Sequence, residues 1–249
     1  MVIAVEPLSH PKGALSMLKG VAFVNVADNQ VAKLKIFGDK VTFGLTPDCD
    51  YPTDLHHEKD GTITLTINAQ EVPTNSTNLS FAKNIIACAA IAQELGLEWD
   101  AIIDRIKTFI SPKGRCEIKN NGELIIIDDT YNANLESTIA AINYLKAFSG
   151  DGKRIFVFGD MLELGESSIT QHQAIGEKCN DSRIDAVLTI GTETIATDGA
   201  LLDIGFHRHF NKKDDLLKSL NEIVKDGDKV LVKGSRGMRM ETIVEGMLI

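Results

Sequence analysis

The segment DDTYNAN holds the residue types in this sequence that are best suited to chemistry. Its carboxylates are Asp128 and Asp129, and its phenol and amides are Tyr131, Asn132 and Asn134. Carboxylate and amide groups at this spacing could hydrogen-bond the hydroxyls of a ribose or orient a metal-bound water. The alternative is structural: Asn132 or Asn134 caps a helix, and the carboxylates interact with the helix dipole. The sequence leaves both interpretations open.

A second candidate is the basic segment KGSRGMRME, in which Lys233, Arg236 and Arg239 follow an apolar stretch. Such a cluster suits a carboxylate or phosphate ligand, especially through bidentate arginine. The alternative is a solvated helix start whose cations pair with the acidic surface. The segment GDMLELGE lacks the spacing of a phosphate-binding loop and is better interpreted as a loop that lines a cleft. His172, alone on a predicted helix, is expected to be a packing or capping residue.

These segments follow apolar strands that alternate with helices. Strands are predicted at 123–128, 154–159, 186–191 and 229–234, and helices at 135–148, about 169–179, 212–224 and 239–248. Continuous apolar strands separated by helices are typical of a Rossmann-like α/β domain, with a mostly parallel sheet and helices on both faces. Such sheets bind ligands at the carboxyl ends of their strands. Here those ends carry DDTYNAN, GDMLELG, GTET and KGSRGMRME, which predicts a ligand site at that edge.

The earlier part of the chain has a different pattern. Short strands rich in Val, Ile, Thr and Phe are predicted at 21–27, 40–45 and 62–67. A helix that ends near Gly96 and a shorter amphipathic helix follow. Ser111-Pro112-Lys113-Gly114 is the best boundary, because Pro and Gly interrupt regular structure. We therefore expect two domains, residues 1–112 and 113–249.

Composition limits the partners of the chain. Its 249 residues are 43% hydrophobic and 24% charged, and the net charge of −9 argues against a nucleic acid or an anionic membrane as a general partner. A small basic pocket remains compatible, with Arg115 and the 233–239 turn as candidates. No apolar run approaches the ~20 residues of a membrane helix. The four cysteines show no CxxC spacing and are expected to be reduced thiols in a cytoplasmic protein.

Three longer motifs carry a family resemblance. IIIDDTYNANLEST, RIFVFGDMLELGESS and VLVKGSRGMRME resemble the C-terminal domain of the Mur ligases, and within that family the branch that adds D-alanyl-D-alanine. Residues 113–115, Lys-Gly-Arg, are similar to the Gly-Arg at the family's domain junction. Residues 1–112 resemble the last part of its central ATPase domain: GVAFVNVAD looks like its VNADD strand, and PKGALSML looks like the segment with its carbamylated lysine. The resemblance implies a C-terminal domain preceded by a partial central domain.

The resemblance also implies an activity. In this family ATP phosphorylates the terminal carboxylate of a UDP-N-acetylmuramoyl tripeptide, and the amine of D-Ala-D-Ala then displaces phosphate; Mg²⁺ assists. The implied catalytic residues are Lys12, which would also be a metal ligand when carbamylated, and Arg115. The implied ATP-binding residues are Asn84, Arg115, Asp128, Asp129, Tyr131, Asn132 and Asn134. The implied substrate-binding residues are Lys233, Ser235 and Arg236.

Two departures from the family pattern qualify this expectation. The family's adenine-side helix usually carries two asparagines, and Phe81 occupies the position of the first. The chain also contains no glycine-rich GxxGK[ST] phosphate loop. We therefore expect the chain alone to be inactive as a ligase and to need an N-terminal half as partner. The alternatives are a non-catalytic nucleotide- or peptide-binding module, half of a split ligase and, less favoured, a folate-type polyglutamyl ligase.

Overall fold

The computed structural model of the chain describes residues 2–5, 20–29, 31–33, 35–36, 38–58, 62–76, 79–109, 113–148 and 150–248. The chain divides into two compact units, residues 1–110 and 111–249. Lys12, the predicted metal ligand, lies outside the described residues. Within the described residues, no helix has the length and apolar character that crossing a bilayer requires. The four cysteines, all among the described residues, form no disulfide in the structure.

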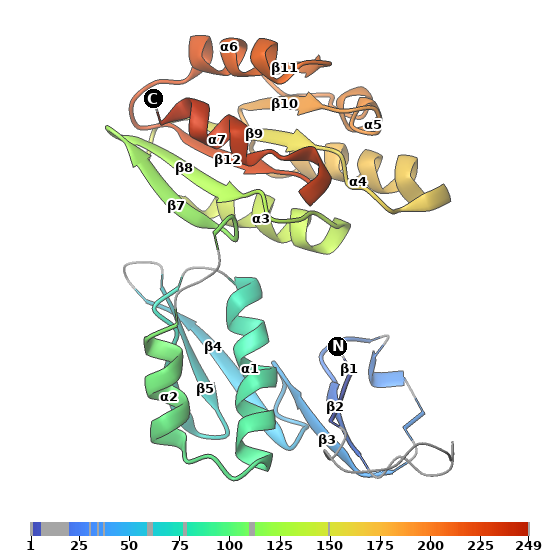
Figure 1. The fold of residues 1–249 in the computed structure, drawn as a ribbon, viewed down its shortest axis with the longest axis vertical. Helices are drawn as coiled ribbons and strands as arrows, with labels where there is room; N and C mark the ends of the chain where they lie inside the picture. The colour runs from blue at the N-terminus through green and yellow to red at the C-terminus, as the bar shows by residue number, and fades with distance from the viewer. Residues whose placement is uncertain are drawn as a thin grey trace. The chain divides into compact units, whose positions relative to one another are not determined.

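The first unit combines a mixed sheet with two helices (Figure 1). Its strands are β1 (Val2–Val5), β2 (Val21–Asn25), β3 (Lys40–Gly44), β4 (Tyr51–His57), β5 (Ile63–Ile67) and β6 (Gln70–Pro73), hydrogen-bonded in that order. The pairs β2–β3 and β3–β4 are parallel, and the other pairs are antiparallel. Helices α1 (Leu79–Glu94) and α2 (Trp99–Lys107) follow, and a short 3-10 turn, η1, spans Val31–Lys33.

The core of the first unit forms because apolar side chains of α1 cover the sheet. Ala82, Ile85, Ile86 and Ala89 of α1 are buried in one cluster with Ile63, Leu65 and Ile67 of β5. Trp99 and Ile102 of α2 join the same cluster, Trp99 being partly buried. The sequence pattern placed α1 and its end near Gly96 correctly. It missed β4, because Pro52, Asp54 and His56 interrupt the apolar pattern that predicts a strand.

The second unit is a six-stranded sheet with the strand order β11-β10-β9-β12-β8-β7. Its strands are β7 (Glu117–Asn121), β8 (Leu124–Asp129), β9 (Arg154–Gly159), β10 (Ala186–Ile190), β11 (Phe206–Phe210) and β12 (Lys229–Lys233). All neighbours are parallel except β7, which runs antiparallel to β8. The α-helices are α3 (Leu135–Ala147), α4 (Ser168–Asn180), α5 (Ile195–Gly199), α6 (Lys213–Ile223) and α7 (Glu241–Met247), with 3-10 turns η2 (Gly165–Ser167) and η3 (Arg236–Met238).

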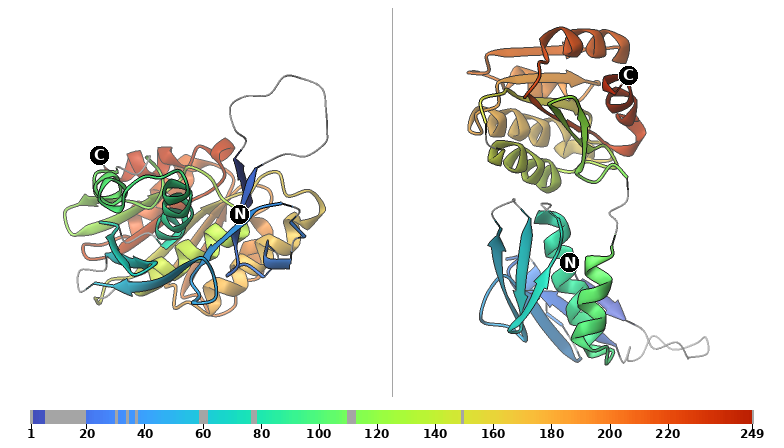
Figure 2. Two further views of the ribbon diagram at one scale, coloured as in Figure 1. Left: turned by 90° about the horizontal axis from the view of Figure 1, so that it is seen from below. Right: turned by 90° about the vertical axis from the view of Figure 1, so that its left-hand side faces the viewer.

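Helices cover both faces of this sheet, as the sequence predicted. Alternate strand residues such as Ile126, Val157 and Val232 are buried in one cluster with side chains of α6 and α7. Residues one position away, such as Ile127 and Phe158, belong to a second cluster with α3 and α4. The right-hand view in Figure 2 shows α3, in yellow-green, and α7, in red, on opposite sides of the strands. This arrangement explains why the inner strands are continuous apolar runs in the sequence, since both of their faces are buried.

The two edge strands of the second sheet escaped prediction. β7 reads EIKNN and β11 reads FHRHF, and neither is an apolar run. An edge strand has only one strand neighbour and keeps polar and charged side chains in contact with water. The four predicted strands are the inner ones, which lie within one or two residues of their expected ranges.

Candidate functional site at the carboxyl edge of the second sheet

The carboxyl ends of the inner strands align at one edge of the sheet. Lys233 at the end of β12 lies opposite Asp129 of β8 and Phe158 of β9. Ile190 at the end of β10 lies opposite Gly159. The polar segments that follow these four strands are therefore neighbours, although more than 100 residues separate the first from the last.

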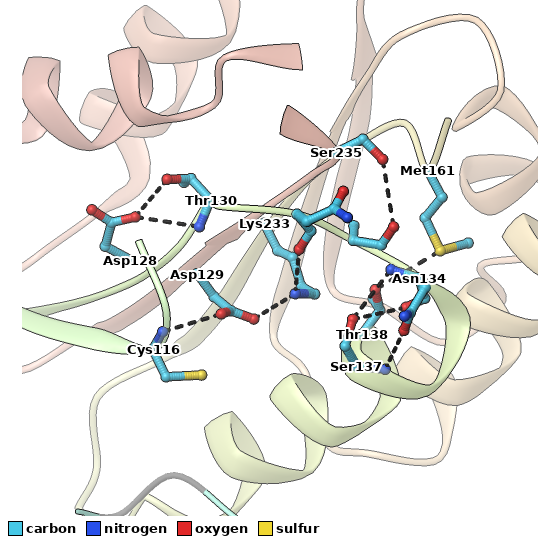
Figure 3. A network of polar contacts seen from close by, with 12 residues as sticks. Cys116, Asp128, Asp129, Thr130, Asn134, Ser137, Thr138, Met161, Lys233 and Ser235 are labelled. Carbon is cyan, nitrogen blue, oxygen red and sulfur yellow. Dashed lines mark hydrogen bonds and ion pairs between the residues drawn. The ribbon is translucent and has the colours of Figure 1, made fainter. Parts of the chain in front are cut away.

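An ion pair joins two of these strand ends. The Lys233 ammonium donates to Asp129 Oδ2 at 2.5 Å and to the Asn132 carbonyl at 2.9 Å. The other oxygen of Asp129 accepts the backbone N–H of Cys116 at 3.1 Å (Figure 3). Lys233 is 1% exposed, whereas the Asp129 side chain keeps 13% of its surface. Burial, and then the charge of Asp129, raise the pKa of the Cys116 thiol well above its ordinary value, which keeps it a thiol.

Asp128 has different partners, because consecutive strand residues point to opposite faces. Its Oδ1 accepts the hydroxyl of Thr130 at 2.7 Å, and its Oδ2 accepts the Lys119 ammonium at 2.5 Å. Partial burial lowers the pKa of Lys119, but the hydrogen bond and charge of Asp128 outweigh it, so that the pKa lies above its ordinary value. Each carboxylate thus faces its own lysine, and the two do not form a shared site.

The structural alternative for DDTYNAN is confirmed for Asn134. This residue is the N-cap of α3: its Oδ1 accepts the backbone N–H of Ser137 at 2.8 Å, and the Ser137 hydroxyl accepts the backbone N–H of Asn134 at 3.2 Å. This reciprocal pair is a capping box. Asn132 does not cap the helix; its side chain is exposed, and its carbonyl accepts from Lys233.

Arg115 and Tyr131 form an exposed pair beside Asp129. The Arg115 guanidinium carbon lies 4.1 Å from the centroid of the Tyr131 ring, which is a cation–π geometry. The backbone N–H of Tyr131 donates to the Gly114 carbonyl at 2.9 Å, which holds the two segments together. Gly114 has a φ of +73°, and a Cβ there would lie 3.1 Å from Thr130 Oγ1. Only glycine fits both conditions without strain.

The predicted basic cluster of the 233–239 turn is separated in the structure. Lys233 is buried in its ion pair, while Arg236 and Arg239 are exposed. The nearest acid to Arg236 is Glu241, at 3.7 Å. Ser235 is buried as well: its hydroxyl accepts the backbone N–H of Leu162 at 2.8 Å and donates to the Ala133 carbonyl at 3.5 Å. The charge of Lys233 is thus already neutralised, and Arg236 and Arg239 keep the solvated positions of the alternative interpretation.

Two buried polar side chains, Asp160 and His172, make the hydrogen bonds that hold the loop after β9. The sequence indicates no specific role for Asp160 and predicts a packing or capping role for His172. Asp160, 5% exposed, accepts the backbone N–H groups of residues 192, 193 and 194 at 2.9 to 3.1 Å. His172 is fully buried; its Nδ1 donates to the Ser168 carbonyl at 2.8 Å, and its Nε2 accepts the Met161 N–H at 3.0 Å. These bonds define the neutral Nδ1–H tautomer and confirm the packing role expected for His172.

Two further predicted residues lie before the second unit in the chain. Asn84 is exposed on α1 of the first unit, and Lys12 lies outside the described residues. The sequence did not predict the pairing of Lys119 with Asp128, because strand β7 lacks an apolar pattern. The one indication of a strand there is the apolar Ile118 between Glu117 and Lys119. No group of three or more His, Cys, Asp or Glu side chains among the described residues could hold a metal ion.

Comparison with known proteins gives a consistent result. Residues 114–236 match the family described as Mur ligase, glutamate ligase domain. The chain is 40% identical over 134 residues to the UDP-N-acetylmuramoyl-tripeptide–D-alanyl-D-alanine ligase of Bacillus subtilis, covering 53% of this chain and 29% of that protein. It is 30% identical over 244 residues to the ligase of the same name from Escherichia coli, and this alignment covers 92% of this chain and 52% of the E. coli protein. The chain spans about half or less of the length of these relatives.

Solved structures agree on the fold. MurF from Acinetobacter baumannii superposes with a TM-score of 0.82 at 23% identity, covering 93% of this chain and 52% of that one. The MurF ligase from Thermotoga maritima, solved in complex with ADP, superposes with a TM-score of 0.76 at 26% identity. This superposition covers 92% of this chain and 53% of the T. maritima chain.

Proposed function

Because the second unit belongs to the Mur ligase family as its C-terminal domain, we propose that the protein is an ATP-dependent amide ligase of peptidoglycan precursor synthesis. Its relatives point to the branch that adds D-Ala-D-Ala to a UDP-N-acetylmuramoyl tripeptide. The aligned segments cover most of this chain but about half of the E. coli ligase. The activity of the whole enzyme is therefore part of the proposal. A cytoplasmic location goes with it and agrees with four free cysteines.

The observation that carries the nucleotide part of this proposal is the geometry of Asp129. Each carboxylate oxygen has about two lone-pair directions. One on Oδ1 is used by Cys116 N–H and one on Oδ2 by Lys233. The Cys116 thiol is a further hydrogen-bond partner of this carboxylate. The acceptor capacity that remains belongs to a side chain that is 13% exposed at the carboxyl edge of a parallel sheet. The two oxygens of one carboxylate match the two adjacent hydroxyls of a ribose, and the T. maritima relative was solved with ADP.

In the proposed reaction, ATP transfers its terminal phosphoryl group to the carboxylate of the tripeptide, and ADP leaves. The amine of D-Ala-D-Ala then attacks the acyl phosphate, forming the amide and releasing phosphate. This chain would contribute Asp129 to the ribose and the exposed Arg115 to the phosphates. Arg115 stacks on Tyr131, which limits its conformations and suits a preorganised cation.

Mg²⁺ supplies charge neutralisation in phosphoryl transfer. The described carboxylates do not fit it, because Asp128 and Asp129 are each paired with a lysine and no described cluster offers three ligands. We therefore assign no metal-dependent step to them.

A second candidate is a module that binds nucleotide or peptide without catalysis, or that acts as half of a split ligase. The sequence favours it in one respect: the 249 residues contain no GxxGK[ST] phosphate loop. Both candidates share the ribose site, and they differ in turnover.

Titration calorimetry of the purified chain with ADP tests the shared part. We expect binding by the wild type and a loss of about tenfold or more in affinity for Asp129→Ala, since a hydrogen bond to a charged group contributes roughly 1.5–3 kcal/mol. Asp203→Ala is the matched control, because Asp203 is an exposed aspartate of the same unit. Absence of ADP binding by the wild type, or equal affinities of wild type and Asp129→Ala, would contradict the proposal.

A further inference from the structure

We infer that Lys233 is a positioning residue of the nucleotide site: it orients the carboxylate of Asp129 toward a vicinal diol and does not itself contact substrate. This inference rests on the proposed ribose site. It replaces the substrate-binding role that the sequence predicted for Lys233 with a role that acts through Asp129.

Strand register brings the two side chains together. Lys233 and Asp129 are Cα partners in the parallel pair β12–β8. Both also continue the same face of the sheet, since the residues two positions earlier, Leu231 and Ile127, share one buried cluster with α3. Side chains that share register and face in neighbouring strands lie side by side. The 2.5 Å ion pair is thus a consequence of the sheet itself.

Burial separates the roles of the two residues. Lys233 is 1% exposed, and its side chain is enclosed between the strand ends and the 130–134 segment. A buried ammonium needs partners, and the Asp129 carboxylate and the Asn132 carbonyl provide them. The carboxylate side chain retains 13% of its surface, whereas the Lys233 side chain retains 2% and its ammonium is held by two acceptors.

Two donors on opposite oxygens fix the carboxylate plane. Cys116 N–H binds Oδ1, and Lys233 binds Oδ2 (Figure 3). Removal of Lys233 leaves Asp129 free to rotate and removes the bond that ties the Asn132 carbonyl, and with it the loop that carries Tyr131, to β12. The predicted consequence is a specific loss of hydroxyl recognition.

The test compares two probes, ADP and 2′,3′-dideoxy-ADP, which lacks both ribose hydroxyls. We expect the wild type to prefer ADP by about tenfold or more, because two hydrogen bonds to a carboxylate are lost with the analogue. Lys233→Met should abolish this preference while affinity for the dideoxy probe changes little. Asp129→Asn should do the same, and the double variant should lose no more than either single variant.

Lys119→Met is the matched control. It removes a lysine that forms an equally short pair with the adjacent carboxylate, Asp128, on the other face of the sheet. It should lower stability without changing the preference for ADP. Should Lys233→Met fail to fold, Lys233→Gln, whose amide keeps one donor, should show an intermediate preference.

The outcomes separate the two claims. If Lys233→Met or Lys233→Gln prefers ADP over the dideoxy probe as strongly as the wild type does, the positioning role is wrong and the ribose site is unaffected. A wild-type chain that binds ADP and its dideoxy analogue equally, or binds neither, overturns the ribose site and the positioning role together.

Discussion

Gly191 lies directly against the carboxylate of Asp160: a Cβ on Gly191 would fall 2.2 Å from Asp160 Oδ1. The same carboxylate accepts three consecutive backbone N–H groups from the turn that Gly191 begins. Gly191 has a φ of +127°, which residues with a side chain rarely adopt. The turn after β10 is thus closed by one acid and one glycine that lie on adjacent strand ends.

Gly191→Ala should therefore destabilise the second unit strongly. We expect a loss of at least about 3 kcal/mol in the free energy of unfolding, because the added methyl group displaces a buried carboxylate from its three donors. Urea unfolding followed by circular dichroism measures it. Gly199→Ala is the control: no atom lies within 4 Å of its Cβ position, so it should be neutral or slightly stabilising. Similar losses in the two variants would contradict the steric explanation.

The two asparagines of DDTYNAN should differ in stability. Asn134→Ala removes the N-cap of α3 and should cost about 1 kcal/mol. Asn132→Ala should change the free energy of unfolding by less than about 0.5 kcal/mol, because its side chain is exposed and only its carbonyl makes a described contact. Thermal unfolding of both variants decides the point, and a larger effect at Asn132 would refute the capping assignment.

The first unit should lose stability at high pH through Tyr51. Burial, and then the hydrogen bond to Glu94, raise the pKa of Tyr51 to about 12. The unfolded chain ionises near pH 10. The folded state therefore holds the phenolic proton more tightly, and the associated stability is present below pH 10 and disappears as the pH rises toward 12. The loss is at most about 2–3 kcal/mol, since one pKa unit corresponds to about 1.4 kcal/mol.

Tyr51→Phe checks this pH dependence. At neutral pH the variant should be less stable by about 1 kcal/mol, because the 2.9 Å bond to Glu94 is lost. Above pH 11 it should be the more stable protein. Trp99, the only tryptophan, lies in α2, so its fluorescence reports unfolding of this unit. Tyr131→Phe, an exposed site in the second unit, should leave that transition unchanged. A constant difference between Tyr51→Phe and wild type from pH 7 to 12 would rule out the assignment.

The chain alone should show no ligase turnover. Its sequence has no GxxGK[ST] loop to position and neutralise the transferred phosphoryl group. With ATP, Mg²⁺, UDP-N-acetylmuramoyl tripeptide and D-Ala-D-Ala, phosphate release should equal that of the enzyme-free mixture. The E. coli ligase in the same assay is the positive control. Sustained phosphate release by the isolated chain would show that its own residues suffice for phosphoryl transfer.

The inner strands of the second unit were predictable because local sequence carries their signal. β8, β9, β10 and β12 are buried on both faces, so each appears as a short apolar run. The same reasoning failed for β4, β7 and β11, whose polar residues hide the strand pattern. The prediction that polar segments meet at the carboxyl edge followed from parallel topology and is confirmed by the register of β12 with β8 and β9.

The sequence by itself determined the α/β class of the second unit, its inner strands and the edge where its polar segments gather, because apolar periodicity and strand polarity are local properties. Only the tertiary structure decided which charges pair. It joined Lys233 to Asp129 and Lys119 to Asp128. It also separated Lys233 from the arginines of its own segment. These pairings depend on strand order, register and face, which arise when segments distant in the chain pack together and bury their charges in pairs.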